Sequence, residues 1–264
     1  MKILFFGDIV GKIGRTAIRQ VIADLKKEVE PDLIMANVEN LAHGTGVTEK
    51  TLQELLDLGF GFFTSGNHIF DKPEAEVLLS RKDFPLIRPA NYPLQTPGDG
   101  YKIISVGSRS LLIVNLIGRV FIKENFDCPF RKIDEILAAV DTKKLAGIIV
   151  DFHAEATSEK IAMGHYLAGR VSAVLGTHTH VATADARILP PGTAYLTDIG
   201  MVGAMDSVIG VDKGPVLKMF LSQMPASFQI PEEGEVIINA VVLTIDPQNQ
   251  KVLDLTRLDR VVKV

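Results

Sequence analysis

Seven polar side chains of types that commonly bind metal ions directly follow apolar segments of this sequence. They are Asp8, Glu39, Asn40, Asn67, His153, His178 and His180. Imidazole, carboxylate and amide oxygen form a mixed nitrogen and oxygen ligand set, which suits iron or manganese first and also zinc or cobalt. Seven ligands are too many for one ion, so the set predicts two ions about 3.5–4 Å apart with one bridging carboxylate. Such a pair can polarise a phosphoryl oxygen and activate water, which is the chemistry of phosphoester hydrolysis.

Each of these motifs is weak evidence when taken alone. A Gly-Asp pair such as Gly7-Asp8 is more often a turn than a ligand, and a single histidine is more often a surface residue or a satisfied polar group. The His178-Thr179-His180 motif is stronger, because alternate residues of an extended segment face the same side. The prediction therefore depends on the conjunction of motifs after five separate apolar segments.

Strands and helices that alternate along the chain are expected to position these residues. We expect strands over residues 2–6, 32–36, 61–64, 147–152 and 172–176. We expect helices over residues 14–30, 48–58, 73–81, 131–140 and 158–170. Such alternation predicts parallel βαβ units, and the carboxyl ends of parallel strands are where α/β proteins bind ligands.

The rest of the chain is predicted to be mostly β. A hairpin is expected over 102–116, turning at Gly107-Ser108, and further strands within 187–198, 235–246 and 251–258. One helix, around 214–223, interrupts the last third. Because neither repeats nor a linker is visible, we expect a single α/β domain spanning residues 1–264, with a mixed sheet or two packed sheets.

Composition limits the classes of function. The net charge of −4 offers no basic surface, so stable binding of duplex nucleic acid is not expected, although a small anionic substrate remains compatible with a metal site. The single cysteine, Cys128, excludes an intramolecular disulfide and fits a reducing cytoplasm. Because Gly7 and Asp8 interrupt the first apolar run and no later run is long enough to span a membrane, we expect a cytoplasmic protein without a membrane segment.

Taken together, the motifs resemble those of the calcineurin-like metallophosphoesterases. They are G-D at 7–8, E-N at 39–40, G-N-H at 66–68, His153 and G-T-H-T-H at 176–180. A-H-G-T-G at 42–46, R-P-A-N at 88–91 and D-F-H-A-E-A-T-S-E-K at 151–160 resemble one branch in particular, the YmdB-like bacterial 2′,3′-cyclic nucleotide phosphodiesterases. The resemblance covers nearly the whole chain. It implies a four-layer α/β fold in which two mixed β-sheets are flanked by helices.

The resemblance also implies how the ligands are shared between two metals. The superfamily usually begins with Asp-x-His, but here Asp8 is followed by Ile9 and Val10, and the branch implies that Asn40 takes the vacant position. Glu39 stands where the superfamily commonly has a bridging aspartate. The implied first set is Asp8, Glu39, Asn40 and His180, and the implied second set is Glu39, Asn67, His153 and His178.

His68 resembles the general acid of the Gly-Asn-His motif. An alkoxide leaves slowly, and an imidazole near neutral pKa can donate the proton that it needs. The alternative is that His68 only orients the neighbouring Asn67. By resemblance, a metal-bridging hydroxide would attack phosphorus and expel the 2′-oxygen, which His68 would protonate, giving a nucleoside 3′-phosphate.

Weaker predictions concern contacts outside this set. His43, Arg88 and Arg119 are candidates for substrate binding, although surface positions and ion pairs are common alternatives for such residues. Asp151, two residues before His153, could orient that ring or could be a polar residue at a strand end.

The leading hypothesis is metal-dependent hydrolysis of 2′,3′-cyclic nucleotides, with RNA ends as a related substrate. A nucleotidase-like phosphomonoesterase with the same dinuclear site is one alternative. A regulatory metal-binding protein with incidental turnover is another. A metal amidohydrolase is disfavoured by the Gly-Asn-His and His-x-His motifs. The hydrophobic content of 47% is compatible with a homo-oligomer.

Overall fold

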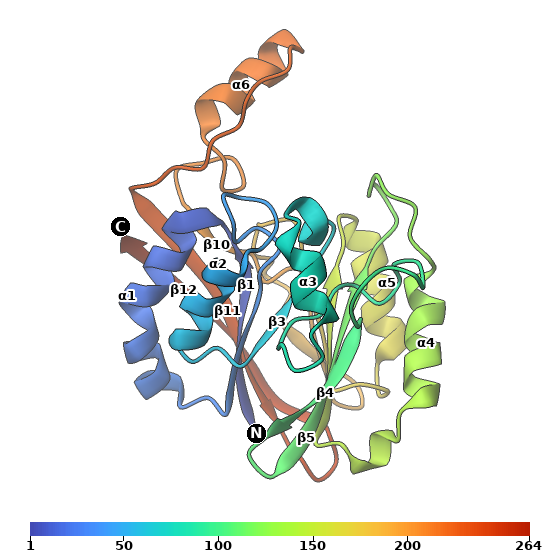
Figure 1. The fold of residues 1–264 in the computed structure, drawn as a ribbon. Coiled ribbons are helices and arrows are strands. Elements are labelled where there is room, and N and C mark those ends of the chain that lie inside the picture. The colour runs from blue at the N-terminus through green and yellow to red at the C-terminus, as the bar shows by residue number, and fades with distance from the viewer.

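Two six-stranded β-sheets pack face to face, and helices cover their outer sides in the computed structural model, which describes residues 1–264 (Figure 1). The strands are β1 Lys2–Ile9, β2 Leu33–Asn37, β3 Phe62–Thr64, β4 Tyr101–Val106, β5 Arg109–Ile117, β6 Gly147–His153, β7 Ala173–Thr177, β8 Arg187–Leu189, β9 Thr193–Leu196, β10 Met201–Ala204, β11 Glu235–Ile245 and β12 Val252–Lys263. The α-helices are α1 Gly11–Val29, α2 Glu49–Asp57, α3 Glu74–Ser80, α4 Pro129–Ala139, α5 Thr157–Leu167 and α6 Lys213–Ser222. Two short 3₁₀ helices are η1 Ile69–Asp71 and η2 Thr142–Lys144.

Both sheets are mixed. The first has the order β12-β11-β10-β1-β2-β3, in which β10, β1, β2 and β3 are parallel and β11 runs antiparallel to both of its neighbours, β10 and β12. The second has the order β4-β5-β6-β7-β9-β8, in which β5, β6, β7 and β9 are parallel. The prediction of two mixed sheets flanked by helices is therefore confirmed.

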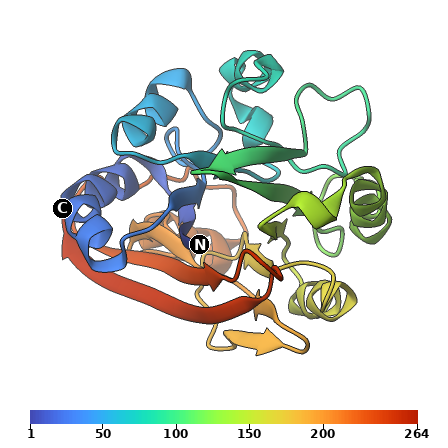
Figure 2. The same cartoon turned by 90° about the horizontal axis from the view of Figure 1, so that it is seen from below.

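Side chains of β1 show why the central strands are apolar on both faces. Ile3 and Phe5 pack between the two sheets, whereas Leu4 and Phe6 face the helices, and all four are fully buried. Successive side chains of a strand point to opposite faces, so a strand covered on both sides needs a continuous apolar run. Seen from below, α1 and α2 lie outside one sheet and α4 and α5 outside the other (Figure 2).

The predicted elements are present, with differences at their ends. Helix α1 begins at Gly11 rather than Gly14. The sequence does not indicate this start, because the N-cap residue, Val10, has no side chain that can cap a helix. Strand β10 was not predicted, because four residues are too few for a periodic pattern. This strand lies in the sheet because it pairs in parallel with β1, with Asp8 and Met201 as paired residues.

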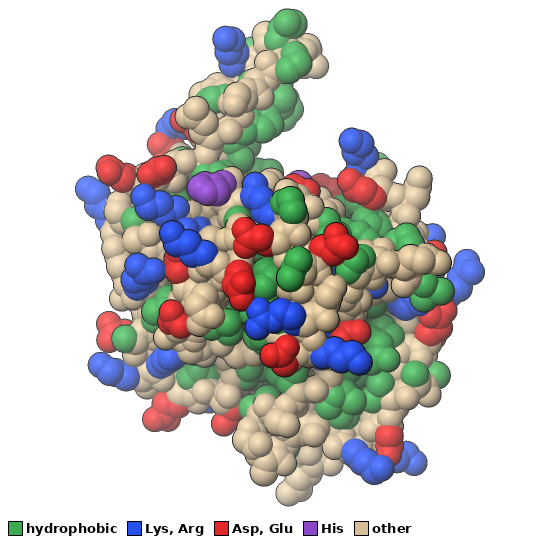
Figure 3. Space-filling model, viewed as in Figure 1, with side chains coloured by type: hydrophobic (Ala, Val, Ile, Leu, Met, Phe, Trp, Pro, Cys, Tyr) green, Lys and Arg blue, Asp and Glu red, His purple; other side chains and the backbone are tan.

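Helix α6 belongs to an excursion between β10 and β11 that projects from the sheets (Figure 1). Apolar side chains are exposed on this helix and on the segment that follows it (Figure 3); they are Leu217, Phe220, Leu221, Met224 and Phe228. We call this group the arm. None of the helices combines the length and apolar character needed to cross a bilayer.

Substitution of a glycine in α5 tests how closely this helix packs on the second sheet. A Cβ at Gly164 would overlap the ring of Tyr195, which is buried in β9. We expect Gly164→Ala to lower the free energy of unfolding by about 1–3 kcal/mol, even though alanine favours a helix by about 1 kcal/mol. The matched control is Gly214→Ala in α6, where the nearest atom is a flexible carboxylate oxygen at 3.3 Å. Urea denaturation that ranked the two variants equally would contradict this packing.

Candidate metal centre

The carboxyl ends of parallel strands from both sheets bring the predicted ligands together. Asp8 lies near the end of β1, and Glu39 and Asn40 follow β2, which pairs with β1. His153 is the last residue of β6, and β7 ends at Thr177, directly before the two remaining histidines. The two sheets thus supply opposite walls of one site, as the strand pattern predicted.

Three side chains form a cluster that could hold a metal ion. Ligand atoms of Glu39, His153 and His178 all lie within 4.8 Å of one another. His153 Nε2 lies 3.0 Å from Glu39 Oε1 and 3.0 Å from His178 Nδ1. Two donors that bind one ion at roughly 2.1 Å also lie about 3 Å apart, so these atoms are spaced as ligands of a shared ion would be.

The other predicted ligands extend this cluster. His180 Nε2 lies 3.9 Å from Asp8 Oδ1 and 3.1 Å from Asn40 Nδ2. Asn40 Nδ2 also donates to Glu39 Oε1 at 3.3 Å. Rotation of the Asn40 amide would present its oxygen instead of its nitrogen at this position.

Two buried oxygen atoms in the site have no hydrogen-bond partner. They are Asp8 Oδ1 and Asn67 Oδ1. An unpaired buried polar atom is costly, and each such atom calls for an explanation. Both belong to predicted metal ligands, one from each implied set, so the residues fit two cations that would each satisfy one of these atoms. Gly66 adds space here, because a Cβ would overlap the reactive edge of His153 and the carboxylate of Glu39.

Each of the three histidines is held through its outer nitrogen. His153 Nδ1 lies 2.9 Å from Thr177 Oγ1, which itself donates to Asp151 Oδ1 at 2.7 Å. His178 Nε2 lies 3.2 Å from a carboxylate oxygen of Glu155, and His180 Nδ1 lies 2.8 Å from the backbone carbonyl of Ile209, in the excursion that carries the arm. These acceptors fix the ring orientations and direct the other nitrogen into the site.

Burial and neighbouring charges shift the pKa values in the metal-free site. Burial raises the pKa of Asp8. Burial opposes ionisation of Glu39, but the charge and hydrogen bond of His153 outweigh it and lower the pKa of Glu39 to about 2. Conversely, burial lowers the pKa of His153, but the carboxylates of Glu39 and Asp8 outweigh it and raise it to about 9. Burial and the charge of His153 lower the pKa of His178 to about 3.

His68 lies at the edge of the cluster and is more exposed. Its backbone N–H donates to Glu39 Oε2 at 2.9 Å, so the loop that carries it is tied to the site. Its Nδ1 lies 2.9 Å from Asp71 Oδ2, and the side chain is 39% exposed. This leaves Nε2 free to face solvent or a bound molecule.

The weaker predictions fare differently. Arg88 is buried, and its guanidinium donates to the backbone carbonyls of Pro89, Thr96 and Pro97 at 2.7–3.1 Å, so it holds a loop and the predicted phosphate contact is not supported. Arg119 is exposed beside a pocket of about 360 Å³ that contains none of the predicted ligands.

His43 is exposed in the turn after Asn40 with a φ angle of +59°, and its role in substrate binding stays a prediction. Asp151 acts on His153 through the hydroxyl of Thr177 rather than directly. Burial raises the pKa of Asp151 to about 6.

Several residues of the site were not found from the sequence. Lys160 and Asp198 form a fully buried ion pair behind the loop of His178, and Asp71 and Glu155 contact histidines of the site. Glu155 and Lys160 lie in the D-F-H-A-E-A-T-S-E-K segment, which was the only available signal. Nothing local distinguishes the others from ordinary surface acids.

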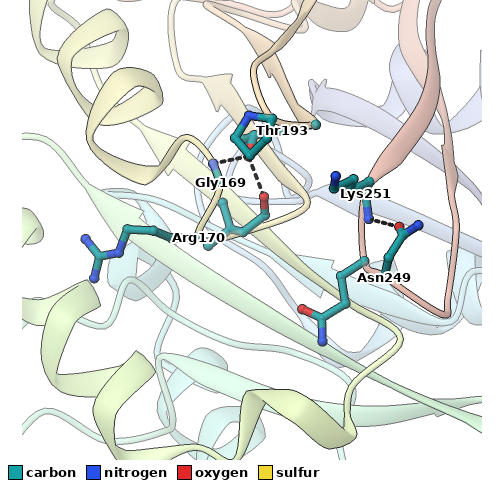
Figure 4. Close-up of a pocket in the computed structure, with 9 residues that line it drawn as sticks. Gly169, Arg170, Thr193, Asn249 and Lys251 are labelled. Carbon is teal, nitrogen blue, oxygen red and sulfur yellow. Dashed lines mark hydrogen bonds between the residues drawn. The ribbon is translucent and has the colours of Figure 1, made fainter.

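A small pocket of about 80 Å³ lies at the opposite ends of the strands (Figure 4). Thr193 Oγ1 there donates to the carbonyl of Val171 at 2.6 Å and accepts from the N–H of Gly169 at 2.9 Å. Its polar groups therefore hold the backbone together, and none of the predicted ligands lines it.

Comparisons with known proteins agree with this arrangement. The sequence model of a family described as YmdB-like protein matches residues 4–258. A 2′,3′-cyclic-nucleotide 2′-phosphodiesterase of Bacillus subtilis (strain 168) is 44% identical over 259 residues, which cover 98% of this chain and 96% of that protein. The crystal structure of a phosphatase from Mycoplasma pneumoniae has a TM-score of 0.92 at 34% identity and covers 99% of this chain and 93% of that one.

A 5′-nucleotidase precursor from Thermus thermophilus shares the fold alone. Its TM-score is 0.58 at 15% identity, and the match covers 100% of this chain and 54% of that one.

Metal binding is expected to release a proton. The carboxylates of Glu39 and Asp8 raise the pKa of His153 to about 9, so we expect this ring to carry a proton at pH 7 before metal binds. Coordination through Nε2 requires that proton to leave, so the affinity for metal should rise as the pH is raised. Calorimetric titration with Mn²⁺ at pH 7, in buffers of different ionisation enthalpy, should show about one proton released. Between about pH 6 and 8 the apparent affinity should rise about tenfold per pH unit.

The matched control is His165→Gln, which changes an exposed histidine on α5 and should leave the proton release unchanged. Binding enthalpies that did not depend on the buffer would contradict the protonation of His153.

Proposed function

Because the chain belongs to the family of YmdB-like proteins, we propose that it is a metal-dependent phosphodiesterase that hydrolyses 2′,3′-cyclic nucleotides to nucleoside 3′-phosphates. The Bacillus subtilis relative, which matches this chain over nearly its full length, is named 2′,3′-cyclic-nucleotide 2′-phosphodiesterase. The observation that carries the proposal is the buried cluster of Glu39, His153 and His178, beside which two predicted ligand oxygens lack any partner.

Two metal ions are part of the proposal. Asp8, Glu39, Asn40 and His180 would hold one, and Glu39, Asn67, His153 and His178 the other. When bound, the ions supply Lewis acidity that polarises a phosphoryl oxygen and activates water. The nitrogen and oxygen ligand set favours iron or manganese.

His68 is the proposed general acid. The carboxylate of Asp71 accepts a hydrogen bond from His68 Nδ1, which orients the imidazole ring of His68 and stabilises its protonated form. The free Nε2–H would then donate to the 2′-oxygen as the P–O bond breaks. The exposure of His68, in contrast to the buried ligands, fits a residue that must meet a substrate entering from solvent.

The substrate is proposed to be a small phosphoester in the cytoplasm, with cyclic phosphate ends of RNA as an extension. The net charge of −4 argues against tight binding of duplex nucleic acid. The proposal includes a homo-oligomer, because the arm exposes apolar side chains that a single chain does not cover.

Hydrolysis of 2′,3′-cyclic AMP beside a simple phosphomonoester tests the proposed activity. Metal-stripped protein reloaded with Mn²⁺ or Fe²⁺ should open the ring to 3′-AMP, and protein without metal should not. We expect Asn67→Ala and His68→Ala to reduce kcat by about 10²-fold or more, measured by chromatography of the products.

The matched control is His165→Gln, which should retain activity. Cleavage of the monoester alone would indicate a phosphomonoesterase instead; the Mycoplasma pneumoniae structure is described as a phosphatase. Absence of turnover on both substrates despite bound metal would favour a regulatory metal-binding protein.

Self-association is tested by charging the arm. Phe220→Asp with Leu221→Asp should convert an oligomer into a single chain, because burying these charges would be unfavourable. Light scattering coupled to size exclusion measures the mass. Leu94→Asp is the matched control, since Leu94 is about as exposed as Leu221 but lies outside the arm. A wild-type protein that elutes as one chain would remove the oligomer from the proposal.

A further inference from the structure

The turn His178-Thr179-His180 holds two predicted metal ligands in an unfavourable backbone conformation. The φ angle is +103° at His178 and +64° at His180, in a region that residues with a side chain rarely adopt. A residue in such a conformation persists only where surrounding contacts hold it. The turn therefore depends on contacts that fix its backbone.

A buried ion pair makes these contacts. Lys160 Nζ, from α5, donates to Asp198 Oδ2 at 2.6 Å and to the carbonyl of Thr177 at 2.8 Å. The same Asp198 oxygen accepts from the N–H of Thr179 at 3.1 Å. Both charged side chains are at most 1% exposed. The pair thus holds the backbone just before the first histidine and between the two.

The other carboxylate oxygen of Asp198 links this turn to β1. It accepts from the N–H of Gly200 at 2.8 Å, and the carbonyl of Gly200 accepts from the N–H of Asp8 at 3.0 Å. Asp8 Oδ2 in turn accepts from the N–H of His178 at 3.1 Å. A closed ring of hydrogen bonds therefore joins ligands that come from opposite sheets.

We propose that Lys160 and Asp198 are positioning residues for the metal centre. They hold the two histidines of the turn in place relative to Asp8, without touching metal or substrate themselves. Stability alone is a weak reason for this pair, because buried ion pairs can often be replaced by apolar residues without loss. The inference rests on the metal site of the proposed function.

The test compares metal binding with folding. Lys160→Met alone leaves the charge of Asp198 buried and unpaired and is expected to fold poorly. The decisive variant is therefore Lys160→Met with Asp198→Asn, which removes both charges. We expect its thermal midpoint without metal to stay close to that of the wild type. Its affinity for Mn²⁺ should fall by about 10- to 100-fold, and the visible absorption spectrum of bound Co²⁺ should change.

The matched control is Met163→Ala, which removes a buried apolar side chain from the same helix. It should lower the thermal midpoint and leave Mn²⁺ affinity and the Co²⁺ spectrum unchanged. The inference is overturned if the double variant binds Mn²⁺ with wild-type affinity and an unaltered Co²⁺ spectrum. It is also overturned if Met163→Ala weakens binding as much as the double variant does. A wild-type protein that binds no Mn²⁺ would instead overturn the proposed metal site, and this inference with it.

Discussion

Burial of charge where the two sheets meet is the constraint on which the rest of the structure depends. Asp8, Glu39 and His153 are at most 1% exposed, and removing an ion from water costs several kcal/mol unless it is paired. In the metal-free protein the imidazolium of His153 compensates Glu39, but Asp8 Oδ1 stays without a partner. The chemistry of the site therefore fits a further positive charge.

Around this cluster, glycines allow neighbouring backbone segments to come into direct contact. Gly7 sits where β1 shifts register against β2, and a Cβ there would overlap the carbonyl of Gly200. A Cβ at Gly176 would likewise overlap the carbonyl of Thr197. Strands that must come this close tolerate only glycine. The left-handed conformations of His178 and His180 then turn two imidazoles into the gap between the sheets.

The site has a rigid interior and an accessible edge. The outer nitrogens of the predicted histidine ligands are fixed by hydrogen-bond acceptors, whereas His68 is held by Asp71 at one nitrogen and its side chain remains 39% exposed. A preorganised, buried interior suits groups that bind and polarise a substrate, because they need not reorganise during the reaction. An exposed imidazole suits a group that must take up a proton from water in each cycle.

The sequence alone determined the alternation of strands and helices and the seven candidate ligands, because periodicity and residue type are local properties. It also predicted two mixed sheets, through motifs that carry a family resemblance. Only the tertiary structure decided that Arg88 holds a loop, since its partners are carbonyls whose positions depend on the folded chain. The pairing of Lys160 with Asp198, which lie 38 positions apart, was likewise invisible. Contacts of this kind form between segments that are distant in the sequence, and no local sequence pattern indicates which segments will lie next to each other in the fold.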